Sequence, residues 1–288
     1  MVELCLERID SKANSRPNGF MLQTLHTPFS QSQSWTLKLF FTILFLFLSA
    51  CSNLNVQIPD PMVESPVVWK SQGSFGVALG GRSGHSYEFS GDASQRPPDL
   101  DHPEILSASA FFGGLNYSLI DRLQVGLNIY PFSGGAEPGV KWQFLGENGA
   151  GPQMSVSGSF GYYQTSKSGN QNGEFGPGGY NWEGKARGSS SRIGLSMGYF
   201  ISPNALVYAG GSVASLHVSA DIDHSANSDN TSPAASYSVT DSGSAWSAGG
   251  GLEFGTGAKI LMGYTFTQIK YDKIASENKS QWQLGLVF

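Results

Sequence analysis

The sequence has little charge and almost no cysteine. Lys, Arg, Asp and Glu make up 14% of its 288 residues, against a usual share of about 25%, and the formal net charge is -5. A basic surface of the kind that binds nucleic acid is therefore not expected, and we exclude that class. Cys5 and Cys51 are its 2 cysteines, which excludes a disulfide framework. No phosphate-cradling loop, paired metal-ligand motif or nucleophile elbow is present, so we expect no cofactor and no metal.

Glycine, by contrast, is abundant. The 37 glycines disfavour an all-helical fold, because a glycine in a helix interior costs about 1 kcal/mol relative to alanine. Aromatic residues make up 12% of the chain and hydrophobic residues 40%, which is more apolar side chain than disordered chains carry. The composition therefore favours an ordered protein that is not all-helical.

An apolar run with one threonine extends from Leu39 to Leu48, directly after Lys38. Ten residues span about 15 Å as a helix, whereas the hydrocarbon core of a membrane is about 30 Å thick. The run is therefore too short for a membrane anchor and is typical of a secretory signal peptide, which is removed on export.

The residues that end this run are Leu48-Ser49-Ala50-Cys51, and they resemble the lipobox of bacterial lipoproteins. The resemblance implies that residues 1–50 are a signal peptide, that the mature chain begins at Cys51, and that its thiol carries a diacylglyceryl group. The alternative is a buried cysteine after a core helix, but the run is apolar on every side and lacks a 3.6-residue period. Ser52 is compatible with transport to the outer membrane, so the lipoprotein-sorting machinery is an expected partner.

Two further features of the N-terminal region concern its boundaries. A start at Met21 would give a signal peptide of ordinary length, so we interpret residues 1–20 as an over-long N-terminal extension. Residues 51–66 contain Pro59, Pro61 and Pro66, which predicts a semi-rigid tether. The tether would join the lipid to a domain over residues 67–288.

The domain over residues 67–288 consists of segments of about ten residues in which apolar and polar positions alternate, a pattern typical of transmembrane β-barrels. The expected strands are 69–79, 111–119, 123–130, 140–144, 154–162, 193–201, 206–210, 246–254, 260–266 and 282–288. The predicted fold is all-β, an antiparallel transmembrane up-and-down barrel of about ten strands. Beyond Gly210 the alternation is lost, which indicates a bulge or a register error there.

The connections alternate between short and long. Short turns are expected near residues 120, 146–152, 203 and 256, and longer polar connections at 82–104, 132–138, 164–190, 221–242 and 272–279. In such barrels the short turns are periplasmic and the long loops lie outside. The first strand would then start on the periplasmic side, where a lipid on Cys51 would enter the inner leaflet.

The last strand carries Trp282, Leu284, Leu286 and the terminal Phe288 on one face. This pattern resembles the insertion signal of outer-membrane β-barrel proteins and implies the barrel-assembly machinery as a partner. Two aromatic belts are expected at the membrane boundaries: Trp69, Tyr117, Trp142, Phe144, Tyr199, Tyr208, Phe254 and Phe288 toward the periplasm, and Trp246, Tyr264 and Trp282 toward the outside.

The alternation alone does not decide which face is inside. A soluble ligand-holding barrel or sandwich would turn the apolar face inward. The opposite face is rich in Ser, Gly, Gln, Asn and Lys, which suits a hydrated lumen better than a solvent-facing coat. By strand parity we expect five lumenal charges: Lys70, Lys141, Arg192, Glu253 and Lys259. Glu253 and Lys259 flank one turn and are expected to pair. We favour a filled interior over an ion-conducting one, because ten strands enclose little space.

Two acidic clusters lie in predicted outer loops, Asp99-Leu100-Asp101-His102 and Asp221-Ile222-Asp223-His224. They resemble the residues with which omptins, ten-stranded outer-membrane proteases, activate a water at the barrel mouth. Solvated loop acids that bind divalent cations loosely are the alternative, which we prefer. His217-Val218-Ser219 resembles the His-x-Ser of outer-membrane lipid A deacylases, which implies a serine nucleophile, but no glutamate stands at a suitable position after it.

We therefore expect a lipoprotein barrel of the bacterial outer membrane, in contact with its lipid, with a structural or loop-presenting role and no catalysis. An omptin-like hydrolase and a narrow pore are the alternatives, and the oligomeric state is left open. Catalysis would require Asp99 or Asp101 to meet Asp223 or His224, and we predict that they stay apart.

Overall fold

The computed structural model describes residues 53–68, 72–90, 92–147, 149–171, 180–226 and 234–288, which all belong to one compact unit. The signal peptide, Cys51, Trp69 and Lys70 lie outside the described residues. Within these ranges no helix is both long and apolar enough to cross a membrane.

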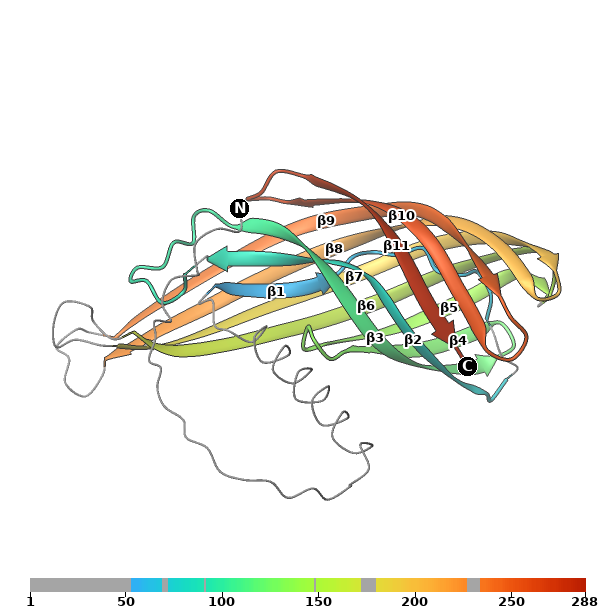
Figure 1. Cartoon of the computed structure of the whole chain (residues 1–288), viewed down its shortest axis with the longest axis horizontal. Coiled ribbons are helices and arrows are strands. Elements are labelled where there is room, and N and C mark those ends of the chain that lie inside the picture. Colours follow the sequence, from blue (N-terminus) through green and yellow to red (C-terminus); the bar gives the residue numbers. More distant parts are fainter. Residues whose placement is uncertain (1–52, 69–71, 91, 148, 172–179, 227–233) are drawn as a thin grey trace, which may run out of the picture. The chain divides into compact units, whose positions relative to one another are not determined.

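The described residues form eleven antiparallel strands (Figure 1). They are β1 (Leu54–Pro59), β2 (Phe75–Ser90), β3 (Glu104–Ile120), β4 (Leu123–Tyr130), β5 (Gly135–Glu147), β6 (Ala150–Gln171), β7 (Tyr180–Ser202), β8 (Ala205–Ala226), β9 (Ala235–Phe254), β10 (Lys259–Tyr271) and β11 (Glu277–Val287).

Strands β2 to β11 close into a ring. Each pairs with its neighbour in sequence, and β11 returns to β2 through residues 284–287 against residues 78–81. Strand β1 adds to the edge of β2 and is not part of the ring, so the ring has ten of the eleven strands. The predicted all-β, antiparallel up-and-down barrel of about ten strands is confirmed.

One end of the ring carries short connections and is called the short-turn end here. These connections join β3 to β4, β5 to β6, β7 to β8 and β9 to β10, as the sequence predicted. The opposite, long-loop end differs from the prediction because β6, β7, β8 and β9 are 22, 23, 22 and 20 residues long. Much of the predicted loops 82–104, 164–190 and 221–242 is therefore strand, and β4 joins β5 by a tight turn.

Strand β8 continues into residues 221–226, which the sequence analysis assigned to a loop. Its outward face is apolar and exposed from Val207 to Val213, then polar from Ser215 to Asp223. Its inward face carries the small residues Gly210, Ser212 and Ala214 in the middle of the strand, and then the buried hydrophobic residues Leu216, Val218, Ala220 and Ile222. The register against β7 and β9 continues through this change. The predicted bulge or register error beyond Gly210 is therefore wrong, and the loss of alternation reflects an exchange of the two faces.

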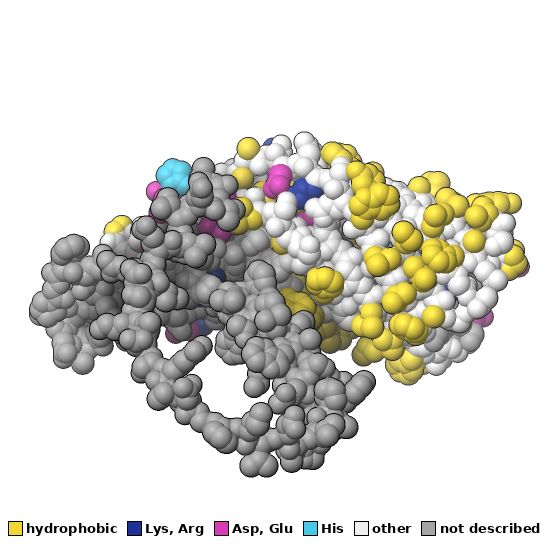
Figure 2. Space-filling model, viewed as in Figure 1, with side chains coloured by type: hydrophobic (Ala, Val, Ile, Leu, Met, Phe, Trp, Pro, Cys, Tyr) yellow, Lys and Arg dark blue, Asp and Glu magenta, His cyan; other side chains and the backbone are white. Residues whose placement is uncertain are grey.

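The same exchange on the neighbouring strands divides the molecule into two parts. Toward the short-turn end, exposed hydrophobic side chains form a band, called the apolar band: Phe75, Val77, Leu79, Phe111, Leu115, Leu127, Ile129, Val140, Trp142, Phe160, Tyr162, Ile193, Leu195, Met197, Tyr199, Ile201, Val207, Val213, Trp246, Leu252, Met262, Tyr264, Trp282, Leu284 and Leu286. Figure 2 shows hydrophobic side chains gathered over this half of the visible face.

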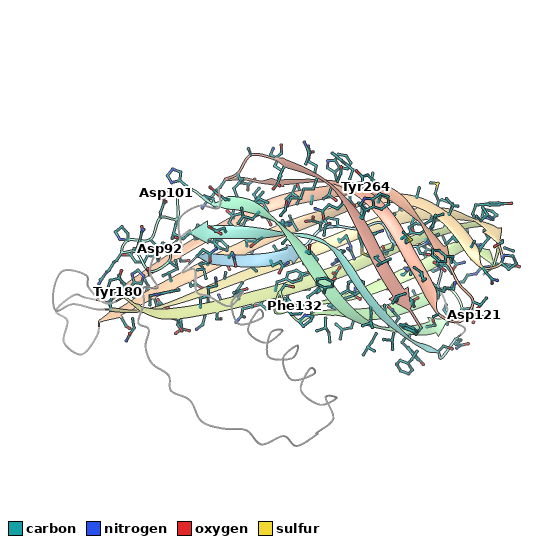
Figure 3. All side chains as sticks on the ribbon, viewed as in Figure 1. Asp92, Asp101, Asp121, Phe132, Tyr180 and Tyr264 are labelled. Carbon is teal, nitrogen blue, oxygen red and sulfur yellow. The ribbon has the colours of Figure 1, made fainter. Side chains whose placement is uncertain are left out.

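The part beyond the band, called the polar extension, consists of residues 164–171, 180–191, 215–226, 235–244 and 268–271 of β6 to β10. Its outward positions are mostly polar and include Ser166, Lys185, Arg187, Ser215, His217, Ser219, Ser238, Thr240, Ser242, Gln268 and Lys270. In Figure 3, Asp92, Asp101 and Tyr180 lie at this end, Asp121 lies at the short-turn end, and Phe132 and Tyr264 lie between them.

The N-terminal residues 53–68, called the inner segment, run inside the barrel. Leu54, Val56 and Ile58 of β1 are 0% exposed and belong to one hydrophobic core with side chains of β2, β7, β8 and β10. The predicted tether over residues 51–66 is wrong in its described part. The alternating Leu54-Asn-Val56-Gln-Ile58 pattern is itself a strand signal, and it outweighs the prolines that follow it.

Candidate functional site

The lumen within the apolar band contains a cluster of charges centred on Glu137 of β5. Its carboxylate pairs with Arg82 and lies 2.7 Å from an amino nitrogen of Arg192. Tyr130 and Ser159 donate hydrogen bonds to the same carboxylate, at 2.7 and 2.6 Å. Because both of its oxygens have several donors, Glu137 is held as a buried ion without exposure to lipid. Sequence reasoning missed it by assigning residues 132–138 to a loop, although Glu137 shares its parity with Lys141.

The inner segment completes this cluster. Glu64 lies 3.2 Å from Arg192 and 3.5 Å from Lys141, measured between charged nitrogen and carboxylate oxygen. The Ser65 hydroxyl donates to Glu253, which also accepts from Lys259 at 2.6 Å. The structure thus turns Lys141, Arg192, Glu253 and Lys259 toward the interior, while Lys70 is outside the described residues. A cavity of about 130 Å³ remains beside these groups.

A second join between the inner segment and the wall lies deeper in the polar extension. Asp60 Oδ1 is 2.7 Å from His85 Nδ1, and His85 Nε2 is 2.9 Å from the Tyr271 hydroxyl. All three side chains are at most 1% exposed. A histidine between a carboxylate and a hydroxyl is an arrangement used in catalysis, but here no substrate reaches it and the hydroxyl is a phenol.

Tyr87 lies beside this join and belongs to the same buried set. Its hydroxyl donates to Asp241 Oδ2 at 2.7 Å. Burial, together with the neighbouring Asp241, raises the pKa of the Tyr87 phenol well above its ordinary value, so the phenol stays protonated and remains a donor. Among the described residues no group of three or more His, Cys, Asp or Glu could hold a metal ion.

The first acidic cluster is exposed and local. His102 Nδ1 lies 3.2 Å from the Asp99 carboxylate, with the two side chains 83% and 59% exposed. The backbone N–H of Asp101 and the side chain of His102 lower the pKa of Asp99. The described contacts of Asp99 therefore stay within its own loop.

The second acidic cluster is on strand β8, and its members face opposite sides. Asp223 is exposed on the outward face, whereas His224 is 1% exposed and donates from Nε2 to the Ala93 carbonyl, 3.1 Å away. Tyr180 and Tyr237 flank the His224 ring. The loop predicted at 221–242 is wrong for these residues, because neighbours along a strand point to opposite faces. Asp223 and His224 therefore do not form an Asp/His pair.

The His217-x-Ser219 motif lies on the outward face of the polar extension. His217 Nδ1 contacts the Ser242 hydroxyl of β9 at 3.1 Å, so its described hydrogen bond is across the sheet to Ser242 and not to Ser219. The geometry supplies no activated serine at this motif.

The C-terminal residues close the ring. Phe288 exchanges two backbone hydrogen bonds with Val77 of β2, at 2.9 and 3.2 Å. Trp282, Leu284, Leu286 and Phe288 are all exposed on the outward face. Of the residues expected in the aromatic belts, Tyr208 is 3% exposed and points inward, so its assignment to a belt is wrong: it packs against the inner segment.

No family model and no curated protein matches the sequence. Among solved structures, the chain is similar to the N-terminal β-barrel domain of Pseudomonas aeruginosa OprF, at 13% identity over 76% of this chain and 100% of that one, with a TM-score of 0.31. It is also similar to Ail of Yersinia pestis, at 15% identity over 75% and 99% of the two chains and a TM-score of 0.33. A third is the Escherichia coli outer membrane protease OmpT, at 10% identity over 83% and 95%, with a TM-score of 0.35.

The location of the barrel follows from its own surface. The apolar band on β7 runs from Ile193 to Ile201, nine residues, which matches the about 9 to 11 residues of a tilted transmembrane β-strand. Around the ring each wall strand pairs with both of its neighbours, and the seam between β11 and β2 is paired over residues 284–287 and 78–81, which is the closed arrangement that lipid requires. The protein is a barrel of the bacterial outer membrane.

Proposed function

We propose that this protein is a non-catalytic outer-membrane lipoprotein that displays a folded polar surface outside the cell, on a barrel closed by its own N-terminal segment. The observation that carries this proposal is the exchange of faces on β6 to β10. Beyond the apolar band these strands bury hydrophobic side chains inward and expose polar ones outward, as in a water-soluble protein. A polar outward surface of this kind is stable in water and unfavourable in lipid.

The polar extension is built as a rigid surface. Its outward side chains include ion pairs between Arg187 and Asp221, 2.8 Å apart, and between Lys185 and Glu183, also 2.8 Å apart. Exposed pairs of this kind add little stability. The inward core, which includes Leu216, Val218 and β1, supplies the rigidity. An adhesive or envelope-organising role fits a displayed sheet of this kind.

The lipid in this proposal comes from the lipobox at Leu48–Cys51. The thiol of Cys51 would lose its proton and form a thioether with the diacylglyceryl group of a phospholipid, whose phosphorylated head group leaves. Hydrolysis of the peptide bond between Ala50 and Cys51 would then remove the signal peptide. Two acyl chains give stable membrane anchoring where one does not.

Two alternatives receive less support. An omptin-like hydrolase would need a carboxylate and an imidazole at one water, but Asp223 and His224 lie on opposite faces of β8. A narrow pore would need an open lumen, and the inner segment occupies it with Glu64, Ser65 and β1.

The proposal is tested by thiol labelling of intact cells. A lipid-modified Cys51 leaves the mature chain without a free thiol, so an introduced cysteine is the only reactive one. Ser238→Cys, on the outward face of the polar extension, is expected to react with a membrane-impermeant maleimide on intact cells. Thr256→Cys, in the turn between β9 and β10, serves as the matched control and should react only after permeabilisation.

The same strains report the lipid, since radiolabelled palmitate should enter the protein and should be lost in Cys51→Ser. Labelling of Thr256→Cys but not Ser238→Cys on intact cells would show that the barrel has the opposite orientation in the membrane. It would contradict the proposal that the polar extension is displayed outside the cell. Lack of palmitate in the protein would contradict its lipoprotein status.

A further inference from the structure

The cavity of about 130 Å³ in the lumen, called the lumenal cavity, is lined mainly by the inner segment and by β2, β4, β5 and β11. On β4 its lining extends from Gln124 to Asn128, about 13 Å along the strand. Gln124 lies three residues after Asp121, which is at the short-turn end (Figure 3). On the other side, Tyr130 and Tyr163 are 0% exposed and belong to the hydrophobic core. The lumenal cavity is therefore near the short-turn end and is closed toward the polar extension.

The described charges that line the lumenal cavity do not balance. Three are the cations Arg82, Lys141 and Arg192, and two are the carboxylates Glu64 and Glu137. Each carboxylate already has two of these cations as partners. The lining thus has an excess of one positive charge, in a protein whose net charge is -5. Because charges that are removed from bulk water need partners of the opposite sign, this excess favours an anion in the cavity.

Arg82 contributes a hydrogen-bond donor that the barrel does not use. Its guanidinium pairs through Nη2 with Glu137 and lies over the Tyr130 ring, 5.0 Å from the ring centroid. The side chain is 5% exposed and lines the lumenal cavity, and its Nε atom has no hydrogen-bond partner among the described residues. A buried donor without a partner is unfavourable, above all on a charged group. The Nε–H of Arg82 therefore points to an acceptor in the cavity.

Two asparagines on neighbouring strands add donors to the same cavity. Asn116 of β3 lies opposite Gly126, and Asn128 of β4 lies opposite Gly114. A Cβ on the glycine would come within 2.5 Å of the amide oxygen in the first pair and within 2.6 Å in the second. The glycines therefore let each amide lie along the wall with its oxygen toward the opposite strand. This arrangement leaves the amide N–H groups for the lumenal cavity, which both asparagines line.

We propose that the lumenal cavity binds a small oxyanion of the phosphate class, which enters from the short-turn end. Its ligands are the Nε–H of Arg82 and the amides of Asn116 and Asn128, and the excess positive charge of the lining balances the anion. Because these donors come from three strands, an ion with several oxygens fits them better than a halide, which is a single atom. The volume of about 130 Å³ is several times the about 30 Å³ that one water occupies in the liquid, which leaves room for phosphate.

The first test is equilibrium dialysis of radiolabelled inorganic phosphate against the purified full-length protein, folded in a maltoside detergent that contains no phosphate. We expect saturable binding of one phosphate per chain, with a Kd at or below about 1 mM. No saturable binding in this range would overturn the proposal. The measurement uses no cells, so its outcome is independent of whether the polar extension is displayed and of whether Cys51 carries a lipid.

Variants of the lining locate the bound phosphate. Asn116→Leu with Asn128→Leu removes both amide donors and leaves the ion pairs in place, so the Kd should rise at least about tenfold. Lys141→Gln removes the excess positive charge and should have an effect in the same direction. Asn278→Leu, on the outward face of β11, is the matched control and should keep the Kd of the unchanged protein. An unchanged Kd in the lining variants, or an equal rise in Asn278→Leu, would overturn the proposal.

Two further measurements complete the test. Arg82→Lys keeps a cation beside Glu137 but lacks the Nε–H, so it should also raise the Kd, and it replaces the double variant if that variant does not reach the heat-modifiable, folded form. Phosphatidic acid in the same micelles carries the same phosphate group on a lipid. It should not displace the radiolabelled phosphate, because the paired seam of β2 and β11 separates the lumenal cavity from the detergent. Displacement would overturn the free anion and assign the site to a lipid head group.

Discussion

Asp60 Oδ1 lies 2.7 Å from His85 Nδ1, and this contact joins the inner segment to the barrel wall where neither side chain meets solvent. A matching pair, Asp99 and His102, is largely exposed to water at the long-loop end. The same two residue types therefore form one buried contact and one exposed contact. Comparing substitutions at the two contacts measures how much burial adds to the contribution of such a contact to the free energy of unfolding.

The first prediction uses this comparison. His85→Ala should lower the free energy of unfolding by about 1 to 3 kcal/mol or more, because it leaves the buried Asp60 carboxylate without this partner. His102→Ala should change it by less than about 0.5 kcal/mol, because its site is exposed. Urea titration in phospholipid vesicles measures both, and equal losses would contradict the buried join. The double variant Asp60→Ala with His85→Ala should lose less than the sum of the single changes.

The second prediction concerns the exchange of faces on β7. Leu195 and Ser189 both point outward, but Leu195 lies in the apolar band and Ser189 in the polar extension. Leu195→Arg should cost about 2 to 4 kcal/mol, since it puts a charge in lipid, whereas Ser189→Arg should cost less than about 0.5 kcal/mol. Unfolding in vesicles gives both values. A large loss for Ser189→Arg would mean that the membrane extends over the polar extension.

The third prediction is that the closed lumen does not conduct. The full-length protein in a planar bilayer should give no steady current above the bilayer alone, because ten strands enclose a narrow lumen and the inner segment occupies it. Asp60→Ala with Glu64→Ala removes two joins to the wall and should produce transient openings. A steady current from the unchanged protein would favour the pore alternative.

The fourth prediction separates two roles of the C-terminal residue. Deletion of Phe288 removes its two backbone hydrogen bonds to Val77 and should slow formation of the heat-modifiable barrel in purified vesicles and in cells. Phe288→Leu keeps the backbone bonds, so it should assemble normally in vesicles; if an assembly machinery recognises the aromatic side chain, as the resemblance implies, this variant should assemble slowly in cells. Normal assembly of Phe288→Leu in cells would remove the aromatic ring from the signal.

The fifth prediction addresses catalysis. Asp99→Ala with Asp223→Ala should leave cleavage of a dibasic peptide by whole cells unchanged, because Asp99 contacts its own loop and Asp223 has its histidine neighbour on the other face of the strand. His85→Ala, at the buried Asp60 join, is the comparison for an indirect effect of instability. Loss of cleavage in the first variant alone would favour the omptin-like alternative.

The sequence determined the class of fold, the ring of ten strands and the four short turns. Alternation of apolar and polar residues is a local signal, since successive side chains of a strand point to opposite faces. It is clear in residues 111–119 and again, after a short turn, in residues 123–129. The same parity turned Lys141, Arg192, Glu253 and Lys259 to the interior. Local pattern was sufficient wherever the outward face meets lipid.

The tertiary structure alone decided the path of residues 53–68 and the extent of the strands. The strand formed by Leu54, Val56 and Ile58 fits inside the ring because small residues of β7 face it. A Cβ at Gly184 would come within 3.1 Å of Leu54, and a Cβ at Gly188 within 2.9 Å of Ile58. Those contacts join residues more than a hundred positions apart. The polar extension was not predicted from the sequence for a related reason. Apolar side chains face outward where a strand lies in lipid and inward where it lies in water, and only the assembled barrel shows where that boundary lies.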